Sequence, residues 1–388
     1  MRDYVHRDSS IQSPALKLIK RAGLFILAGS YFTSLQCGVN KRESTRMPKF
    51  NINWNVTRAC NLRCKHCYYD AASPLPDELS TDEAFALIDD IVATFSDNVR
   101  VTLGGGEPLV RSDVFEIIGY GTERGLSLVL ASNGIALTDA VAKRLKDAGI
   151  AEVIIAIDGM QQTHDSIRGQ GVFERTVKGA RACKAAGLGL VIDPCIMKQN
   201  ERETTQILDL AEELGARQAR LFHYIALGRG AAEIPDAELE LEEYARNVQQ
   251  LYEEQTRRDN LEICTTQACQ YWVVLKRMAD AGRPVPEFYV HEVPGCRAGI
   301  GMLSIKPNGD VVPCPLLEVK AGNVREQRLR EILASEVFTR LQSREVQGRC
   351  GSCTFRDLCG GCRVRAYINS GDYMGEDPLC GAVFFDLV

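Results

Sequence analysis

The chain has 388 residues, of which 45% are hydrophobic and 25% are charged, and its formal net charge is −5. At about 150 residues per domain, this length predicts two or three domains with enough core to fold without disulfide bonds. The mildly acidic balance argues against a protein that coats nucleic acid, so we expect no nucleic-acid partner.

Cysteine is unusually frequent, with 15 residues in the chain. Disulfide frameworks are typical of short secreted chains, whereas this chain is long and many of its cysteines lie only a few residues apart. This pattern favours metal ligation in a reducing compartment over a disulfide framework. We therefore expect a cytoplasmic protein.

Residues 1–48 form an N-terminal extension that we expect to be helical. Basic residues at 17, 20 and 21 precede an apolar run at 22–32, and Cys37 follows, which loosely resembles a signal peptide. The apolar run is too short to cross a bilayer. We interpret the segment as a helix packed on the body of the protein, on a surface or on a partner, and we expect no membrane span.

Residues 49–230 alternate between short β-branched runs and amphipathic helical patterns. The helix at 81–95 is preceded by Ser80, and Glu83 completes a capping box. Strands are expected at 51–56, 99–103, 126–131, 152–157, 188–197 and 218–223. Further helices are expected at 113–123, 139–147, 174–186 and 202–214, several of them ending at a glycine: Gly125, Gly149, Gly187 and Gly215.

This alternation predicts an α/β fold with parallel strands and right-handed crossovers. Six units are too few for a closed eight-fold barrel, so we expect a partial (β/α)6 barrel. Sheets of this kind bind ligands at the carboxyl ends of their strands.

The pattern changes after residue 230. Residues 231–290 are rich in glutamate, with helical patterns at 236–258 and 267–281 and no clear strand, which predicts a helical connector or lid. Residues 291–388 are rich in cysteine and glycine, and 329–342 is their clearest helix. We expect this segment to be a second, iron–sulfur domain.

The first cysteine motif is C-x3-C-x2-C, formed by Cys60, Cys64 and Cys67 directly after the first strand. Three thiolates on one loop can bind a four-iron cube and leave one iron open, and an open metal position is typical of catalysis. The alternative is a zinc knuckle with His66 as fourth ligand, although His66 lies between two of the cysteines.

A three-cysteine loop after the first strand of a partial barrel resembles the radical S-adenosylmethionine (SAM) superfamily. The resemblance implies an anaerobic enzyme that binds SAM to the open iron and cleaves it reductively to a 5′-deoxyadenosyl radical. That radical abstracts hydrogen from a substrate. We expect an electron donor such as flavodoxin or ferredoxin.

The resemblance also implies a SAM site. The second strand ends in Gly104-Gly105-Gly106-Glu107-Pro108, similar to the superfamily's G-G-E-P motif, in which the turn's carbonyls and Glu107 would hold the ammonium group. The residues implied at the cofactor are Tyr68, Gly105, Gly106, Glu107, Pro108, Ser132, Asn133, Asp158 and Arg168. The glycines can instead form a simple tight turn. Asp158 can instead be a cap or turn residue, and Arg168 can be a surface ion pair.

The C-terminal cysteines follow the order of a SPASM domain, which carries auxiliary [4Fe–4S] clusters; a zinc ribbon is the alternative. Cys296 is followed by G-x4-C at Gly309 and Cys314, then by C-x2-C-x5-C-x2-C and a final cysteine. The resemblance assigns one cluster to Cys350, Cys353, Cys359 and Cys380. It assigns the inner cluster to Cys296, Cys314 and Cys362.

The inner cluster lacks an obvious fourth ligand, because Met302 occupies the position where some members have another cysteine. Either its fourth iron is open to substrate, or Cys264 or Cys269 supplies the ligand. Cys183 and Cys195 lie in a helical and an apolar strand pattern, so we expect both to be buried core residues.

Several strings resemble the alternative haem-biosynthesis radical SAM proteins, among them residues 54–58, 307–315, 322–325, 359–367 and 371–378. The favoured hypothesis is removal of a tetrapyrrole side-chain group, with Arg229, Arg297, Arg363 and Arg365 either anchoring acidic side chains or lying solvated on the surface. The alternatives are maturation of a ribosomally made peptide, and a non-catalytic iron–sulfur electron carrier. The G-G-E-P element argues against the carrier.

Overall fold

A single sheet of eleven strands runs through the computed structural model, which describes residues 50–380. These residues belong to one unit, residues 48–388. The expected N-terminal helix and Cys37 lie outside the described residues. The strands are β1 Phe50–Thr57, β2 Val99–Gly105, β3 Ser127–Ser132, β4 Glu152–Ile155, β5 Gly189–Ile192, β6 Cys195–Ile196, β7 Gln218–His223, β8 Glu262–Thr266, β9 Met302–Ile305, β10 Asp310–Val312 and β11 Gly322–Asn323.

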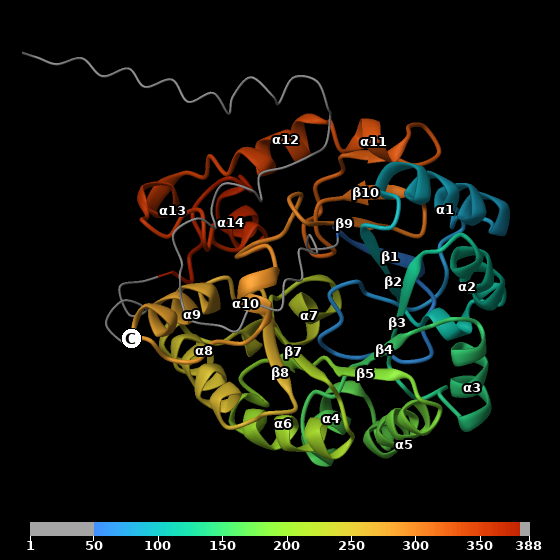
Figure 1. The fold of residues 1–388 in the computed structure, drawn as a ribbon, viewed down its shortest axis with the longest axis horizontal. Helices are drawn as coiled ribbons and strands as arrows, with labels where there is room; N and C mark the ends of the chain where they lie inside the picture. The colour runs from blue at the N-terminus through green and yellow to red at the C-terminus, as the bar shows by residue number, and fades with distance from the viewer. Residues whose placement is uncertain (1–49, 381–388) are drawn as a thin grey trace, which may run out of the picture. The chain divides into compact units, whose positions relative to one another are not determined.

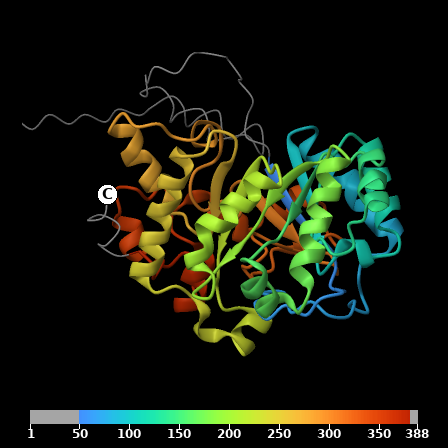
Figure 2. The ribbon, with the colours of Figure 1, turned by 90° about the horizontal axis from the view of Figure 1, so that it is seen from below.

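Helices cover the outer face of the sheet, in an arc that follows the strands (Figure 1). Seen from below, the green helices lie in front of the strands (Figure 2). The α-helices are α1 Thr81–Phe95, α2 Val114–Glu123, α3 Asp139–Asp147, α4 Gln161–Arg168, α5 Val172–Ala185, α6 Thr204–Glu213, α7 Gly228–Glu233, α8 Leu241–Thr256, α9 Tyr271–Asp280, α10 Phe288–His291, α11 Leu329–Ile332, α12 Glu336–Ser343, α13 Gly348–Ser352 and α14 Arg363–Ser370. Short 3₁₀ turns are η2 Pro108–Val110, η3 Glu201–Glu203 and η4 Pro235–Ala237.

The strand order is β11-β10-β9-β1-β2-β3-β4-β5-β7-β6, with β8 paired to β7. The pairs from β1 through β5 to β7 are parallel. Their carboxyl ends therefore meet at one edge, where ligand sites of open α/β sheets lie. The expectation of an α/β partial barrel is confirmed.

Successive side chains along the strands point to opposite faces of the sheet and belong to two different apolar clusters. Leu130, Ile155 and Ile192 belong to the large core between the strands and the helices. Val129, Ile154 and Val191 face the other way and form a small cluster of their own. This alternation follows from the two-residue period of a strand and leaves the inner side of the sheet free for polar groups near the strand ends.

Several predicted elements match closely. The capping box of Ser80 and Glu83 is present at α1, and all four predicted terminal glycines have positive φ. The expected strand at 188–197 is divided into β5 and β6. Pro194 lies between them and has no amide hydrogen to donate to a neighbouring strand.

Three expectations need correction. The connector is not strand-free, because β8 pairs in parallel with β7 over five residues. The helix expected at 267–281 begins only at Tyr271. The helix expected at 329–342 is two helices, with Ser335 as the N-cap of the second. The polar cap and turn residues interrupt the helical period locally.

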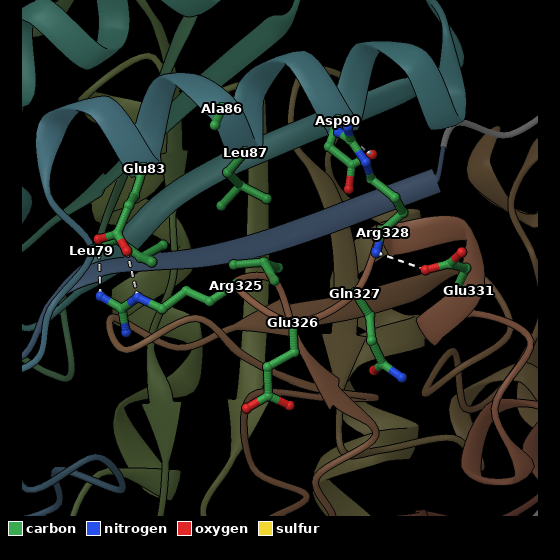
Figure 3. Close-up of a pocket in the computed structure, with 11 residues that line it drawn as sticks. Leu79, Glu83, Ala86, Leu87, Asp90, Arg325, Glu326, Gln327, Arg328 and Glu331 are labelled. Atoms are coloured by element: carbon green, nitrogen blue, oxygen red, sulfur yellow. Dashed lines mark hydrogen bonds and ion pairs between the residues drawn. The ribbon is translucent and has the colours of Figure 1, made fainter.

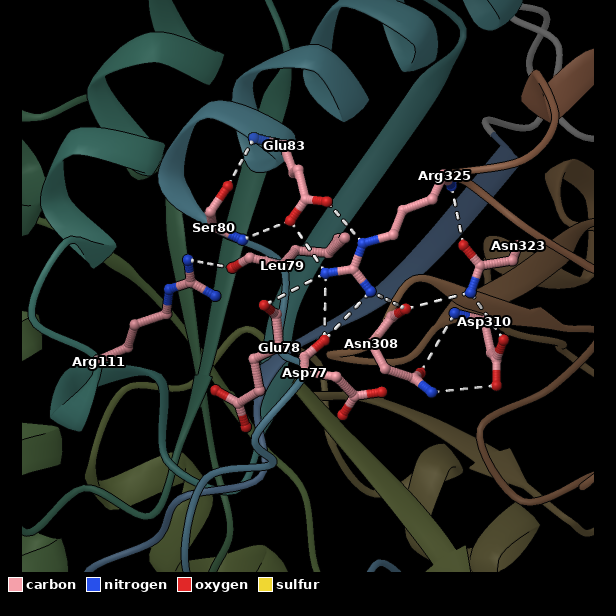
Figure 4. A network of polar contacts seen from close by, with 10 residues as sticks. All are labelled: Asp77, Glu78, Leu79, Ser80, Glu83, Arg111, Asn308, Asp310, Asn323 and Arg325. Atoms are coloured by element: carbon pink, nitrogen blue, oxygen red, sulfur yellow. Dashed lines mark hydrogen bonds and ion pairs between the residues drawn. The ribbon is translucent and has the colours of Figure 1, made fainter.

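The C-terminal region joins the sheet directly, because β9 pairs in parallel with β1. Arg325 adds a second connection (Figure 4). Its Nε and Nη2 donate to the two carboxylate oxygens of Glu83 on α1, at 2.6 and 2.9 Å. Its Nη1 donates to the carbonyl of Asn308 at 2.9 Å.

Within residues 50–380, no helix has both the length and the apolar character needed to cross a bilayer.

Candidate active site

The loop that carries the first three cysteines is closed on itself by main-chain hydrogen bonds. Cys60 N donates to Ala72 O at 3.0 Å, and Ala72 N donates to Arg58 O at 3.1 Å. Glu78 accepts from Arg58 N at 2.7 Å and from Leu75 N at 2.9 Å. The two ends of the loop are therefore held together at the carboxyl end of β1.

The three thiols fit an iron–sulfur cluster. Leu62 N donates to Cys60 Sγ and Ala71 N donates to Cys67 Sγ, both at 3.4 Å, and such amide bonds stabilise cluster thiolates. Burial raises the pKa of Cys64 to about 11, although the neighbouring Arg168 opposes the shift. A buried group of thiols becomes anionic only with a strong cationic partner, which cluster iron supplies when bound.

Among the described residues, no three His, Cys, Asp or Glu side chains converge on one ion-sized point. A four-iron cube binds each thiolate to a different iron, so its ligands need not share such a point.

The glycine turn after β2 lies directly against the cysteine loop. Gly106 N donates to Thr57 O and Glu107 N donates to Ala59 O, both at 2.8 Å. A Cβ on Gly106 would lie 2.0 Å from Ala59 O, and Gly105 has a φ of 119°. The turn therefore requires glycine for close backbone approach as well as for its conformation.

Glu107 is fully buried, and its carboxylate joins the ends of β2 and β3. It accepts from Ser132 Oγ at 3.0 and 3.1 Å and from Asn133 N at 2.8 Å. Burial raises its pKa to about 7, although these hydrogen bonds oppose the shift. The carboxylate thus holds Ser132 and Asn133 in place. Asn133 Nδ2 lies 2.7 Å from Asn61 Oδ1 and 4.0 Å from Cys60 Sγ.

Asp158 and Arg168 form a buried ion pair beside the cysteine loop. Arg168 Nε lies 2.5 Å from Asp158 Oδ2, and Arg168 Nη1 lies 3.9 Å from Cys64 Sγ. Arg168 is the last residue of α4, a helix that the sequence did not predict. Lys65 N of the cysteine loop donates a hydrogen bond to Ile167 O of this helix at 2.9 Å. The surface-pair alternative for Arg168 is wrong, because its side chain is 10% exposed. The cap alternative for Asp158 is wrong as well, because its side chain accepts from Arg168 and from Cys195 N at 2.8 Å.

His66 belongs to the same group. Its Nε2 lies 3.2 Å from Asp158 Oδ2. Burial lowers the pKa of His66 to about 4, so the ring is neutral near pH 7. For Asp158, burial raises the pKa, but the Arg168 guanidinium outweighs burial and keeps the carboxyl ionised.

Tyr68 and Arg229 connect the loop to the rest of the protein. Tyr68 packs on a buried cluster that contains Cys314 of the C-terminal region. Arg229 donates to Cys64 O at 3.0 Å and to Ala71 O at 2.6 Å, and it pairs with Asp70 at 2.8 Å.

Four arginines were expected either to anchor the substrate or to lie solvated on the surface. Three of them do neither. Arg229, Arg363 and Arg365 are 3–4% exposed and bind the protein's own carbonyls or carboxylates. Arg297 is paired with Glu292 at 2.5 Å. Side-chain burial, which decides between the two roles, is not visible in the sequence.

The C-terminal cysteines gather in the cluster on which Tyr68 packs, which contains Cys314, Cys350, Cys359 and Cys362 with Cys296 against it. Asp377 N donates to Cys350 Sγ and Phe355 N donates to Cys353 Sγ, both at 3.4 Å. Burial raises the pKa of Cys380 to about 11, and Cys350 and Cys353 are among its electrostatic neighbours.

A surface pocket of about 480 Å³ lies elsewhere, between α1 and residues 324–331 (Figure 3). Both of its arginines pair with acidic side chains of the lining: Arg325 with Glu83, and Arg328 with Asp90. None of the predicted cysteine ligands lines it.

A parallel α/β sheet with three gathered cysteines and a glycine turn at its strand ends defines the radical SAM class. The chain matches the model of the Radical SAM superfamily over residues 54–211, and that of SPASM, an iron-sulfur cluster-binding domain, over residues 296–354. It belongs to the radical SAM superfamily and is an enzyme with [4Fe–4S] clusters and SAM as cofactors. The zinc and electron-carrier alternatives are thereby set aside.

The similar proteins include both a heme synthase and a maturase. The chain is 38% identical to the AdoMet-dependent heme synthase of Methanosarcina barkeri, over 87% of this chain and 97% of that protein. It is 30% identical to the mycofactocin maturase MftC of Mycobacterium tuberculosis, over 85% and 82%. The crystal structure of Streptococcus suis SuiB bound to S-adenosylmethionine shares the fold, with a TM-score of 0.67 at 19% identity over 86% and 77% of the two chains.

Sequence reasoning missed several residues that position the site. Asn61 contacts Asn133, and Asn200 donates to Asp158 O and Cys195 O, both at 2.7 Å. Gln270 and Asp377 join the connector to the C-terminal cysteines. Asn200 lies among polar and charged residues in the sequence, Lys198, Gln199, Glu201 and Arg202, so no local signal distinguishes it.

Proposed function

We propose that this enzyme removes carboxyl groups from the propionate side chains of an iron-containing tetrapyrrole. The observation that carries the proposal is similarity to an AdoMet-dependent heme synthase over almost the whole length of both chains. The buried C-terminal cysteines support it, because Tyr68 of the cysteine loop packs against them and a cluster held by them would be an electron acceptor near that loop.

The reaction needs such an acceptor. With SAM bound, cofactor chemistry supplies a 5′-deoxyadenosyl radical that takes one hydrogen atom from the propionate carbon next to the ring. Breaking the carbon–carboxylate bond then releases carbon dioxide, forms a vinyl group and leaves one electron. An auxiliary cluster held by the C-terminal cysteines would accept that electron.

We also propose roles for the site residues. Cys60, Cys64 and Cys67 hold the catalytic cluster, and Gly105, Gly106 and Pro108 shape the turn beside it. Ser132, Asn133 and Arg168 face SAM, and Glu107, Asp158 and Tyr68 position them and the loop. The hydrogen bonds that fix Asn133 and Arg168 near Cys60 and Cys64 support this arrangement.

A flavodoxin or ferredoxin is the proposed electron donor, and a reducing compartment such as the cytoplasm is the proposed location. The cysteines between residues 50 and 380 support a reducing compartment, because none of them is in a disulfide.

Anaerobic turnover with SAM and a reductant tests the function. Iron-coproporphyrin, decarboxysiroheme and candidate precursor peptides are supplied separately, and mass spectrometry follows each substrate and 5′-deoxyadenosine. We expect loss of carbon dioxide and hydrogen from a tetrapyrrole, and no product from a Cys64→Ala variant. Modification of a peptide with unchanged tetrapyrroles would assign the enzyme to the maturases, the class to which MftC belongs.

A further inference from the structure

The inner auxiliary cluster has three assigned cysteines, and the connector holds two more. Cys264 and Cys269 are five residues apart, and the sequence does not choose between them. Cys264 lies within β8, where it pairs with Arg220 of β7. Its strongest electrostatic neighbours are Arg220, Glu262, Asp193 and Glu292.

Cys269 lies among the C-terminal cysteines. It is 7% exposed and belongs to the same buried cluster as Cys314 and Cys362, with Cys296 against it. The thiols of Cys269 and Cys296 share a hydrogen bond. We propose that Cys269 is the fourth ligand of the inner auxiliary cluster, together with Cys296, Cys314 and Cys362.

The turn that carries Cys269 is fixed to the segment that carries Cys362. Gln270 Nε2 donates to Asp377 Oδ2 at 3.1 Å, and the same oxygen accepts from Cys362 N at 2.8 Å. Arg365 Nη1 donates to Gln267 O at 2.6 Å, and Gln267 has a φ of 60°. A non-glycine residue keeps such a conformation only where its surroundings enforce it. The turn is therefore held where Cys269 meets the other three thiols.

A buried cation with a free donor lies at the same place. Arg363 is 3% exposed and is an electrostatic neighbour of Cys296. Its Nη1 donates to Tyr373 O and Gly375 O, whereas its buried Nη2 has no hydrogen-bond partner within residues 50–380. An unpaired buried N–H is costly, and the thiolates or sulfides of a cluster are acceptors that satisfy it.

Four protein thiolates leave no open iron for a substrate thiolate. The inner cluster would then exchange electrons with substrate without binding it. This consequence rests on the proposed function, in which one electron must be accepted, whereas the ligand assignment does not depend on it.

The test uses the full chain with Cys60, Cys64 and Cys67 replaced by alanine, so that only auxiliary clusters remain. This parent is reconstituted anaerobically and is expected to hold about eight irons. Cys269→Gly and the matched control Cys264→Gly are made in the parent. Iron and sulfide content and the electron paramagnetic resonance (EPR) spectrum of the reduced protein are measured with and without ethanethiol.

Of the two variants, we expect only Cys269→Gly to change the EPR spectrum. It should lose about one iron per chain if only the iron without its thiolate leaves, and about four if the whole cube is lost. Ethanethiol should restore the parental spectrum, because it replaces the missing thiolate. Cys264→Gly should match the parent. A parental spectrum in Cys269→Gly without thiol, or failure of ethanethiol to restore it, would overturn the assignment. No tetrapyrrole is used, so the result is independent of the proposed function.

Discussion

The Gln270 side chain donates a hydrogen bond of 3.1 Å to Asp377 across 107 positions of the chain. Asp377 is 1% exposed and also accepts from both Nε and Nη2 of Arg365 at 2.8 Å. One carboxylate therefore joins the connector, α14 and the segment before Cys380. The same carboxylate accepts from Cys362 N at 2.8 Å, so it also fixes the segment that carries Cys362.

Replacing Asp377 with alanine should destabilise the enzyme strongly. The substitution leaves the buried Arg365 without its charge partner, and breaking a buried pair costs about 3–5 kcal/mol. Anaerobic urea unfolding measures the effect. Glu376→Ala is the neighbouring control, because its partner Arg349 is 61% exposed, and its midpoint should move far less. Equal midpoints for the two variants would contradict the proposed role of Asp377.

Gly106→Ala should displace the cysteine loop. The new Cβ would lie 2.0 Å from Ala59 O, which is main chain and has little freedom to move. We expect about eight irons per chain in place of about twelve, with SAM cleavage lost. Gly119→Ala on α2 is the control, because nothing lies within 4 Å of its Cβ. It should keep all the iron and gain up to about 1 kcal/mol of helix stability.

Arg168→Gln should weaken SAM binding. A hydrogen bond to a charged group contributes about 1.5–3 kcal/mol, so we expect roughly a 10- to 100-fold loss of affinity. The SAM-induced change in the EPR spectrum of the reduced cluster provides the titration. Arg181→Gln, whose side chain is 63% exposed in a surface pair, should titrate like the wild type. Unchanged affinity in Arg168→Gln would limit Arg168 to a structural pair with Asp158.

The pair between Glu83 and Arg325 should stabilise the protein in a pH-dependent way. The hydrogen bond from Arg325 lowers the pKa of Glu83 from 4.5 to about 2. A lowered carboxyl pKa gives stability that is present above pH 4.5 and is lost as the pH falls toward 2. Glu83 is 39% exposed, so the contribution at pH 7 should stay below about 1 kcal/mol.

The variant Glu83→Gln measures this contribution, because glutamine keeps the cap and removes the charge. The difference in urea midpoint between wild type and variant should narrow between about pH 7 and pH 3. Taking the difference cancels cluster loss that both proteins share. A gap that stays constant over this range would contradict the predicted coupling.

Most helices and strands of the barrel could be predicted from local sequence. Ser80 and Glu83 identify the start of α1, and the period of apolar residues identifies its length. The helix α4 was missed, because its eight residues are polar on most positions and only Ile167 among them is a buried aliphatic residue. The strand β8 was missed because it is an edge partner of β7 within a charged segment.

The sequence by itself determined the chemistry of the protein. The spacing of Cys60, Cys64 and Cys67 and the order of the later cysteines depend on residues close in the chain, and covalent spacing limits which thiols can share one loop. Only the tertiary structure decided which distant groups meet. Cys264 and Cys269 look alike in the sequence, but a strand directs the first toward Arg220, and a turn held by Arg365 and Asp377 directs the second toward Cys296. Burial and long-range hydrogen bonds set these directions, and both arise from packing between segments that are far apart in the chain.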